Sequence, residues 1–154
     1  MSLIKFNNPD EENGFLSNSF ISNFNIHGLC YSSVEQYIAW RKAMYFGDIG
    51  TAVKILDTCD SKEIKGYADS IKIVSDSDWE DVEKEVCYNG CYAKFIQNRD
   101  LYNKLLSFGR DSVFVYCNSD DKVYGVDASD SSLNIWDGKN LLGDCLSMVR
   151  KAIC

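Results

Sequence analysis

The sequence predicts a predominantly α-helical protein with a small β component, an α+β fold, as a single domain over residues 1–154. The chain has 154 residues, 45% of them hydrophobic, which suits one compact core. It has no internal repeat, low-complexity tract or glycine-serine linker, and its one proline, Pro9, lies in a polar lead-in. Apolar residues recur at helical spacing along most of the chain, whereas β-rich runs are few and short.

The first expected elements are a hairpin and a helix. In "FNIHGLCY" two short apolar runs flank His27-Gly28, which predicts a tight turn because glycine tolerates a positive φ. The next stretch predicts an amphipathic helix that ends at about Phe46. Two capping boxes are available to start it: Ser32 with Glu35, or Ser33 with Gln36.

Three helices are expected in the middle of the chain. Two short ones are predicted at 51–60 and 61–68, the second capped by Ser61. Helical spacing continues through 75–98, where Gly90 weakens the middle and predicts a possible irregularity. The start of this long helix carries another capping box, Ser77 with Glu80.

The last third of the chain mixes helix and strand. A helix is predicted at 100–109, with Gly109 in the position where a left-handed cap is common. The segments 112–117 and 122–126 are rich in β-branched and aromatic residues, so they predict two strands joined by the turn "NSDD". An apolar stripe in 140–154 predicts a final helix.

The charge balance argues against general coating of nucleic acid. The formal net charge is −7 and the pI is near 4.6, so the chain repels polyphosphate backbones at long range. A local basic region is the exception, although an ordinary solvated helix face is the favoured explanation of it. Its cations are Lys94, Arg99, Lys104 and Arg110.

The cysteines and the hydropathy pattern bear on location. Seven cysteines are an odd number without the compact spacing of secreted disulfide domains, so we expect reduced thiols and an intracellular, cytoplasmic protein. The longest apolar runs, such as "SVFVYC", are far shorter than the ~18 residues of a membrane span. Neither export nor membrane insertion is expected.

Several common kinds of site have no support in the sequence. It lacks a Walker A loop, a G-x-G-x-x-G turn and a G-x-S-x-G elbow. His27 is the only histidine and lies in a predicted turn, which argues against His-activated nucleophiles and His-rich zinc sites. Cys87 and Cys91 lie four apart but have no second close pair, so no metal is expected.

Carboxylate, amine, phenol and amide chemistry remain. In the opening helix Glu35 and Lys42 are seven residues apart, so they return to nearly the same face ~10 Å apart along the axis, with Tyr37 flanking that face. A carboxylate and an amine at that spacing can hold a small polar ligand. Structural alternatives are open: Glu35 as cap partner of Ser32, Lys42 as a surface cation and Tyr37 as a core aromatic.

Five segments in order resemble one family. They are "GFLSN", "GLCYSSVEQYIAWRKA", "YAKFIQN", "VYG" and "GKNLLGDCLSMVRK". This pattern resembles the NADAR family, also called YbiA-like, from about Gly14 to Arg150. The resemblance implies a compact, mostly helical domain that acts on N-glycosidic bonds of ribosyl compounds. Members of the family remove ADP-ribose from the amino group of guanine in nucleic acid, or cleave ribosylamino intermediates of riboflavin synthesis.

The resemblance also implies site residues. By position, the resemblance assigns catalytic roles to Glu35 and Lys42. Asp127, two residues after Gly125, is a further candidate catalytic acid, and an ordinary loop residue is the equal alternative. The implied substrate-binding residues are Asn18, Tyr37, Lys94, Tyr124, Gly125 and Asn140. No redox cofactor or metal is implied, and the substrate is an ADP-ribosylated nucleotide or nucleic acid.

Two positions depart from the family pattern. Gln36 stands where the family usually has histidine, and Tyr124 replaces the usual tryptophan, which keeps a smaller stacking surface. Substrate preference is therefore less secure than the reaction class. A binding module that recognises ADP-ribose without cleaving it, and an interaction protein that keeps only the fold, are the competing functions.

The expected chemistry assigns a role to each residue. Glu35 acts as acid or base beside the positive charge that develops at the anomeric carbon, and Lys42 forms a Schiff base with the opened sugar. Asn140, with its amide and the backbone N–H groups of a helix start, suits a phosphate or ribose hydroxyl, or serves as an N-cap. Tyr124 stacks on the base or packs in the core, and Lys94 pairs with a phosphate or is a solvated lysine.

Overall fold

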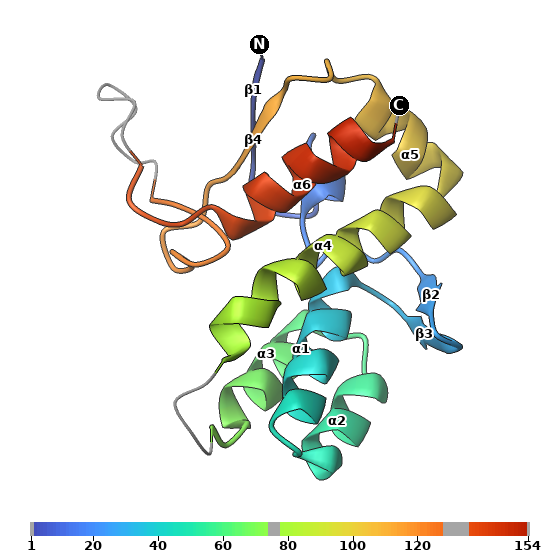
Figure 1. Ribbon diagram of the computed structural model, residues 1–154, viewed down its shortest axis with the longest axis vertical. Helices are drawn as coiled ribbons and strands as arrows, with labels where there is room; N and C mark the ends of the chain where they lie inside the picture. Colours follow the sequence, from blue (N-terminus) through green and yellow to red (C-terminus); the bar gives the residue numbers. More distant parts are fainter. Residues whose placement is uncertain (1, 74–77, 128–135, 154) are drawn as a thin grey trace. The chain divides into compact units, whose positions relative to one another are not determined.

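A computed structural model describes residues 2–73, 78–127 and 136–153 (Figure 1). The contacts between residues divide the chain into two compact units. The terminal unit consists of Met1–Phe20 and Arg99–Cys154, and the central unit consists of Ile21–Asn98. The predominantly helical α+β class is confirmed, and a single domain stays a prediction.

The terminal unit is built on a pair of parallel strands. Strand β1 (Leu3–Phe6) lies beside β4 (Val113–Tyr116), with Leu3 opposite Val113 and Phe6 opposite Tyr116 (Figure 1). Helix α6 (Leu141–Ala152) packs against β4. The unit also contains a 3₁₀ turn (Gly14–Leu16) and α5 (Arg99–Leu106). Its fully buried side chains include Phe114, Val115, Leu142, Cys145, Leu146 and Val149.

Asn140 joins α6 to β4. It precedes the helix with a left-handed φ of 52°, a conformation that asparagine tolerates, and its side chain makes no cap hydrogen bond. Instead, its Nδ2 donates to the Phe114 carbonyl at 2.9 Å and its Oδ1 accepts from the Tyr116 N–H at 3.1 Å. The amide therefore pairs with the strand backbone, and the expected side-chain N-cap of α6 is not formed.

The central unit holds a hairpin and a group of helices. The predicted hairpin is confirmed: β2 (Phe24–Ile26) and β3 (Leu29–Tyr31) are antiparallel, and His27 and Gly28 turn between them with positive φ values of 52° and 86°. The helices are α1 (Val34–Tyr45), α2 (Ile49–Leu56), α3 (Ser61–Ser70) and α4 (Trp79–Gln97).

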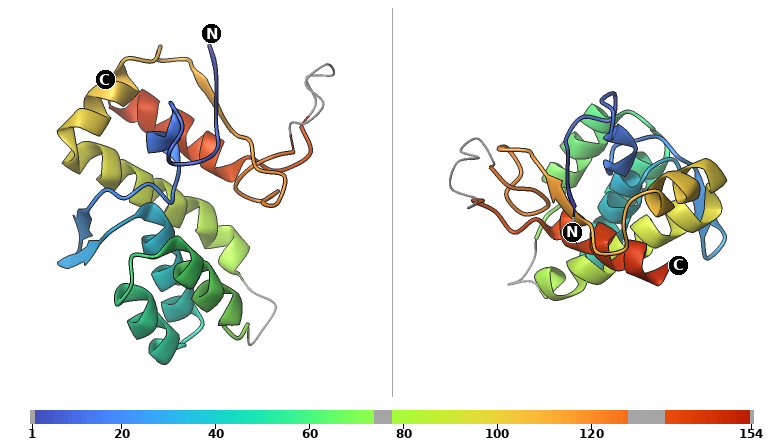
Figure 2. Two further views of the ribbon diagram at one scale, coloured as in Figure 1. Left: turned by 180° about the vertical axis from the view of Figure 1, so that it is seen from behind. Right: turned by 90° about the horizontal axis from the view of Figure 1, so that it is seen from above.

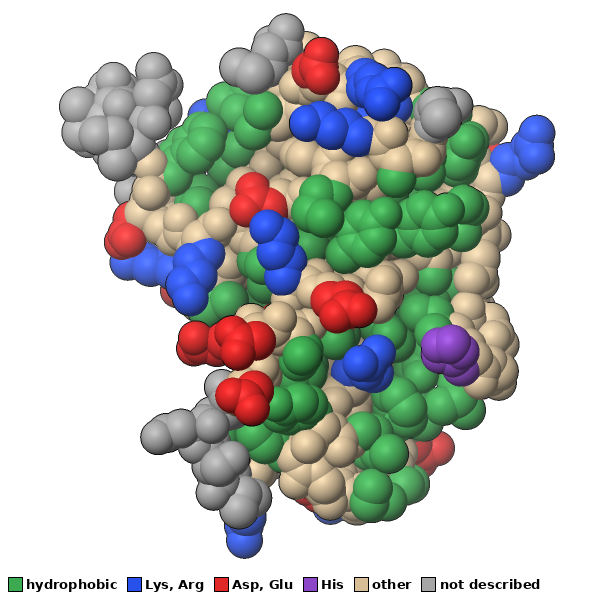
Figure 3. Space-filling view, viewed as in Figure 1, with side chains coloured by type: hydrophobic (Ala, Val, Ile, Leu, Met, Phe, Trp, Pro, Cys, Tyr) green, Lys and Arg blue, Asp and Glu red, His purple; other side chains and the backbone are tan. Residues whose placement is uncertain are grey.

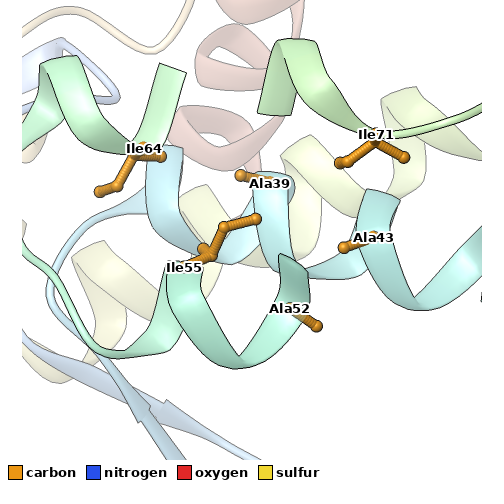
Figure 4. Close-up of a cluster of buried hydrophobic side chains, with 6 residues drawn as sticks. All are labelled: Ala39, Ala43, Ala52, Ile55, Ile64 and Ile71. Atoms are coloured by element: carbon orange, nitrogen blue, oxygen red, sulfur yellow. The ribbon is translucent and has the colours of Figure 1, made fainter. Parts of the chain in front are cut away.

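Helix α1 is the centre of that group. Helices α2 and α3 pack against it and against each other, as Figures 1 and 2 show. Small and branched apolar side chains fill the space between these three helices and the chain that leaves α3 (Figure 4). The members of this cluster are Ala39, Ala43, Ala52, Ile55, Ile64 and Ile71.

Helix α4 approaches α1 at a glycine. A Cβ on Gly90 would lie 3.0 Å from both the Tyr37 ring and Val34, closer than such contacts ordinarily allow. The helix runs through Gly90 without a break, so the irregularity suggested by the sequence does not occur. This glycine serves close packing of the two helices.

The second predicted strand is wrong. Residues 122–125 form turns and a bend, and the partner of β4 is β1, a segment for which the sequence predicts no strand. The Asp121 carboxylate explains the turn, since it accepts hydrogen bonds from the N–H groups of Val123 and Tyr124 at 3.2 and 3.0 Å. Within the predicted segment 122–126, Val126 alone forms an isolated bridge, to Cys117.

Two predicted helix ends also differ. Helix α3 is capped by Asp60, which accepts from the Lys62 N–H, so Ser61 is its first residue and not its cap. Helix α5 ends at Leu106, where the Ser107 hydroxyl donates to the Lys104 carbonyl, and Gly109 lacks the expected positive φ. The expected cap residue Ser77 lies outside the described residues.

Two glycine substitutions should have opposite effects on stability. Gly143→Ala would place a Cβ 2.1 Å from the Phe114 carbonyl oxygen, so it should lower the free energy of unfolding by about 2 kcal/mol or more. Gly66→Ala, inside α3 with no atom within 4 Å of the new Cβ, should raise it by about 0.5–1 kcal/mol. Urea unfolding followed by circular dichroism measures both, and shifts of the same sign would contradict this packing.

Candidate functional site

The first turn of α1 is capped by Ser33 and Gln36. The Ser33 hydroxyl accepts from the Gln36 N–H at 3.1 Å, and the Gln36 side-chain oxygen reaches back to accept from the Ser32 N–H at 2.7 Å. Of the two pairs in the sequence, the structure therefore uses Ser33 with Gln36, although the Gln36 oxygen accepts from the residue before the cap and not from Ser33 itself. Glu35 does not take the capping role that was its main structural alternative.

Gln36 also ties α1 to its neighbours. Its Nε2 donates to the carbonyls of Ile55 and Thr58 at 3.0 and 2.8 Å, and its Oε1 accepts a second hydrogen bond, from the Ser32 hydroxyl. All four hydrogen-bonding positions of this buried amide are filled. At the position where the family usually has histidine, this chain has a residue that fixes the start of α1 against the end of α2.

Glu35 is held by α3. Its Oε1 accepts a hydrogen bond from the Ser61 hydroxyl at 2.7 Å, and its Oε2 lies 3.9 Å from the Lys65 ammonium. The Glu35 side chain keeps 17% of its surface exposed, while Lys65 is 64% exposed, so this ion pair is screened and adds little stability. The hydroxyl bond to Ser61 is the interaction that fixes the direction of the carboxylate.

Lys42 lies two turns further along the same face of α1. Seven residues of α-helix rise ~10 Å and return to within ~20° of the starting direction. The residue is half-buried, and within residues 2–73, 78–127 and 136–153 its ammonium has no hydrogen bond or ion pair. A cation with no carboxylate beside it can receive a ligand.

Tyr37 does not join Glu35 and Lys42. Two residues along a helix correspond to a rotation of ~200°, and Tyr37 packs on the opposite side of α1, against Gly90 of α4. Its hydroxyl accepts from Nη1 of Arg41 at 2.8 Å. Tyr37 is therefore a core aromatic whose hydroxyl lies at the boundary of the core, which is the structural alternative that the sequence leaves open for it.

An aromatic cluster surrounds Tyr37. Its ring makes edge contacts with Tyr31 at 4.9 Å and with Phe24 at 6.1 Å between ring centroids. Burial raises the pKa of Tyr31 to about 12, and Tyr37 adds to the increase while Arg41 opposes it. These contacts fix the hairpin strands on α1 and keep the Tyr37 ring in one orientation.

Lys94 is enclosed by protein. Its side chain is 1% exposed, so it is not the solvated lysine that the sequence left open. Burial lowers its pKa to about 8, although Cys91 and Cys87 on the same face of α4 oppose the decrease. Its Nζ lies 5.1 Å from the centroid of the Phe95 ring. An amine with this pKa is in part neutral near physiological pH.

The remaining predicted site residues belong to the terminal unit. Asn18 is half-buried just after the 3₁₀ turn, and Tyr124 and Gly125 lie in the turn before Val126. The Tyr124 side chain is half-buried in that turn, and therefore it is not an aromatic packed from a strand. Asp127 is also half-buried, and its backbone N–H donates to the Asp137 carbonyl at 2.8 Å.

The start of α6 does not offer its backbone to an anion as expected. The Asn140 N–H donates to the Gly125 carbonyl at 3.2 Å, and the N–H groups of Leu141 and Leu142 donate to Val123 and Tyr124. The Asn140 side-chain amide is hydrogen-bonded to the backbone of β4. The groups expected to bind phosphate therefore already have partners inside the terminal unit.

Sequence reasoning missed several positioning residues. The sequence pattern indicates Ser61 only as a cap, and it assigns no role to Gln97 and Asn98 of "KFIQN". Gln97 exchanges two hydrogen bonds of 2.8 Å with the Asn25 backbone, and the Asn98 amide donates to the Asn23 carbonyl at 3.0 Å. These amides attach the hairpin to α4. The sequence feature that could have indicated this attachment is the pair of adjacent amide residues, Gln97 and Asn98, at the end of the helix.

Metal-binding groups, membrane-spanning helices and surface charge do not point to a further functional site among the described residues. Among the residues that the structure describes, no group of three or more His, Cys, Asp or Glu side chains could hold a metal ion. None of the described helices is long and apolar enough to cross a bilayer. On the face in Figure 3, acidic and basic side chains are interspersed with hydrophobic ones.

Comparison with known proteins identifies the family. The family model of the NADAR domain matches residues 5–154, so the chain belongs to the NADAR family. The N-glycosidase R617 of Acanthamoeba polyphaga mimivirus is 32% identical over 126 residues, which cover 79% of this chain and 74% of that protein. The riboflavin biosynthesis protein VVA0006 of Vibrio vulnificus (strain YJ016) is 29% identical over 150 residues, 97% of this chain but only 38% of that protein.

A solved structure supports the fold. The NMR structure of the E. coli protein YbiA matches with a TM-score of 0.81 and covers 98% of this chain and 84% of that one. Its sequence identity is 22%, so the likeness shows the fold alone. The family and the fold class predicted from the sequence are both confirmed.

Lys94 predicts a pH dependence of stability. Its folded pKa of about 8 lies below the ordinary 10.5, so the cost of burying an ammonium is fully present below pH ~8 and is relieved as the pH rises toward ~10.5. Relative to Lys94→Met, the wild type should therefore gain about 1–2 kcal/mol of unfolding free energy between about pH 7 and about pH 9.5. Denaturant unfolding of both proteins measures it, and a difference that stays constant would contradict the lowered pKa.

Proposed function

We propose that this chain is an N-glycosidase, a hydrolase acting on N-glycosyl bonds, that releases ADP-ribose or a related ribosyl phosphate from an amino group. Relatives named for N-glycosidase and riboflavin biosynthesis support a glycosidase-type function in general. The finer proposal, with guanine in nucleic acid as the bearer of the amino group, follows from the family resemblance. An ADP-ribosylated nucleotide or nucleic acid is then the substrate.

The setting of Glu35 carries the proposal. Gln36 performs the capping that Glu35 could have performed, and the Ser61 hydroxyl orients the carboxylate from a second helix. The side chain is mostly buried but keeps some exposed surface, which suits contact with a ligand. This hydrogen bond joins α1 to α3 across 26 residues of sequence, so the packing of the two helices sets the direction of the carboxylate.

A carboxylate in this position serves the chemistry of N-glycoside cleavage. Positive charge develops at the anomeric carbon as the bond to nitrogen breaks, and a nearby carboxylate stabilises it. Glu35 also takes a proton from the attacking water, whose oxygen forms the new bond to carbon as the amine leaves with the bonding electron pair. The protonated Glu35 then gives that proton to the leaving nitrogen. The Ser61 hydroxyl donates to this carboxylate and orients it for these roles.

A covalent route through a lysine is the second possibility. The ribosylamine opens to an imine, a neutral lysine amine adds to it, and the original amine leaves as a Schiff base forms with the sugar. Water then hydrolyses the Schiff base and restores the lysine. Lys42 is our first candidate because it shares a face with Glu35. Lys94 is the alternative because its lowered pKa supplies the neutral amine, but its side chain is 1% exposed and would have to become accessible to the sugar.

The other predicted residues keep proposed roles in substrate binding. Tyr124 would stack on a base, with Gly125 allowing close approach, and Asn18 would hydrogen-bond the sugar or a phosphate. Asp127 remains a candidate second acid. Because its own groups are bonded within the terminal unit, Asn140 is proposed only to position the turn that carries Tyr124.

A second candidate substrate is favoured by one relative. The name of VVA0006 associates a similar chain with riboflavin biosynthesis, which favours a ribosylamino intermediate of that pathway as the alternative. The Glu35 chemistry is the same for both substrates, because each has a ribose attached through nitrogen. A module that binds ADP-ribose without cleaving it is the remaining alternative.

Glu35 should be required for turnover. With guanine-ADP-ribosylated DNA, Glu35→Gln should lower kcat/KM by at least about 100-fold, because it removes the charge and the base while keeping the shape of the side chain. Glu80→Gln, which neutralises an exposed carboxylate of α4, is the matched control and should be unchanged. Release of ADP-ribose is followed by chromatography and mass spectrometry.

Assays with different substrates distinguish the glycosidase proposals from the binding module. A wild type that leaves the DNA modified but cleaves a ribosylamino pyrimidine phosphate would move the function to the riboflavin intermediate. Tight binding of ADP-ribose without cleavage of either substrate would support the binding module. Full activity of Glu35→Gln would remove the carboxylate from the mechanism.

Borohydride reduction tests the covalent route. Wild type is mixed with substrate, reduced during turnover and digested, and we expect a sugar adduct on the peptide that contains Lys42. An adduct on the peptide that contains Lys94 would assign the nucleophile to the buried amine. If turnover proceeds and neither peptide gains mass, the Schiff base is wrong and direct attack of water remains.

A further inference from the structure

The central unit contains a second candidate site. A surface cavity of about 370 Å³ lies among the hairpin, α4 and the face of α1 opposite Glu35. This volume is within the range of small-molecule pockets. The residues that define its chemistry are His27, Tyr37, Arg41, Asn89, Tyr92 and Ile96.

The cavity favours negative charge. The chain has 23 acidic and 16 basic residues, yet among the described residues that line this cavity there is no Asp or Glu. The lining does include Arg41 and the one histidine of the sequence, His27. A concave surface with a cation and no nearby carboxylate concentrates anions even in a protein of net charge −7.

Arg41 is arranged to receive an anion. Its Nη1 donates to the Tyr37 hydroxyl at 2.8 Å, which fixes the orientation of the guanidinium. In the part of the chain that the structure describes, Arg41 forms no ion pair, so its other N–H groups are open to a ligand. A planar guanidinium with a fixed orientation suits bidentate binding of a phosphate.

The rest of the lining suits a flat polar ring. Tyr92 and Ile96 are four residues apart on α4 and form an adjoining aromatic and aliphatic surface, and the Tyr92 ring stacks on Tyr88 at 6.0 Å. The amide of Gln97 is taken by the Asn25 backbone, whereas that of Asn89 has no hydrogen bond among the described residues. Asn89 can therefore hydrogen-bond the edge of a ring that stacks on Tyr92.

We propose that this cavity binds a nucleotide, with its phosphate on Arg41 and His27 and its base on Tyr92, Ile96 and Asn89. The shared chemistry is a phosphate ester joined to a base, whether in a free nucleotide or in a nucleic acid strand. The cavity lies on the opposite side of α1 from Glu35, so the inference does not depend on the proposed glycosidase function.

Calorimetric titration tests the proposal with four probes: guanosine 5′-monophosphate, guanosine, inorganic phosphate and a short single-stranded oligonucleotide. The monophosphate should bind at least about tenfold more tightly than guanosine or phosphate alone, because both halves of the cavity are then used. Arg41→Gln should weaken its binding at least about tenfold, and Arg41→Lys should retain part of it. His27→Asn, which keeps a residue that tolerates the positive φ, should also weaken binding.

The control variants distinguish a loss of binding at this cavity from an effect of the protein's net charge or of unfolding. Lys54→Gln removes an exposed cation of α2 with the same change of net charge, and it should bind as the wild type does. Glu35→Gln should also retain binding, so failure of the glycosidase proposal and failure of this one give different results. Thermal melts establish that each variant is folded.

The results of these titrations decide whether the proposal holds and which source of nucleotide the cavity prefers. Equal binding of the monophosphate by the wild type and Arg41→Gln, or equal binding of guanosine and its monophosphate, would overturn the proposal, as would no binding of any probe. Tighter binding of the oligonucleotide than of the monophosphate would identify a nucleic acid strand as the source of the nucleotide. The reverse order would identify a free nucleotide.

Discussion

The buried amide of Gln36 is the constraint on which the candidate site depends. It closes the capping box of α1 and also donates to two carbonyls at the end of α2, so one side chain fixes where α1 begins and how α2 leaves it. Helix α3 starts three residues after the second of those carbonyls, Thr58, and its first residue is Ser61. Because Ser61 is placed in this way, its hydroxyl reaches Glu35.

Helix α1 gives different functions to its faces. One face carries Glu35 and Lys42, and the apolar side chains beside them, such as Ala39, pack on α2 and α3. The opposite face carries Tyr37, which contacts α4, and Arg41, and both line the cavity beside the hairpin. A helix of 12 residues thus contributes to two chemically distinct surfaces, one with a carboxylate and one without.

Local patterns predicted the elements whose stabilising interactions are near in sequence. The hairpin at His27-Gly28 and the start of α1 follow from turn and capping chemistry, which act within four residues. The pairing of β1 with β4 was missed because parallel pairing joins segments more than 100 residues apart, and no local pattern reports it. The site shows the same limit, since the bond between Ser61 and Glu35 requires the packing of α3 on α1.

The central claim is that Glu35, oriented by Ser61, acts on the substrate, and a double-mutant cycle on kcat/KM tests it most directly. The activities of the wild type, Ser61→Ala, Glu35→Gln and the double variant are compared. If the hydroxyl acts only through the carboxylate, Ser61→Ala lowers activity in the wild type and has no further effect once Glu35 is replaced. Equal losses from Ser61→Ala in both backgrounds would contradict the account, because the two residues would then act independently.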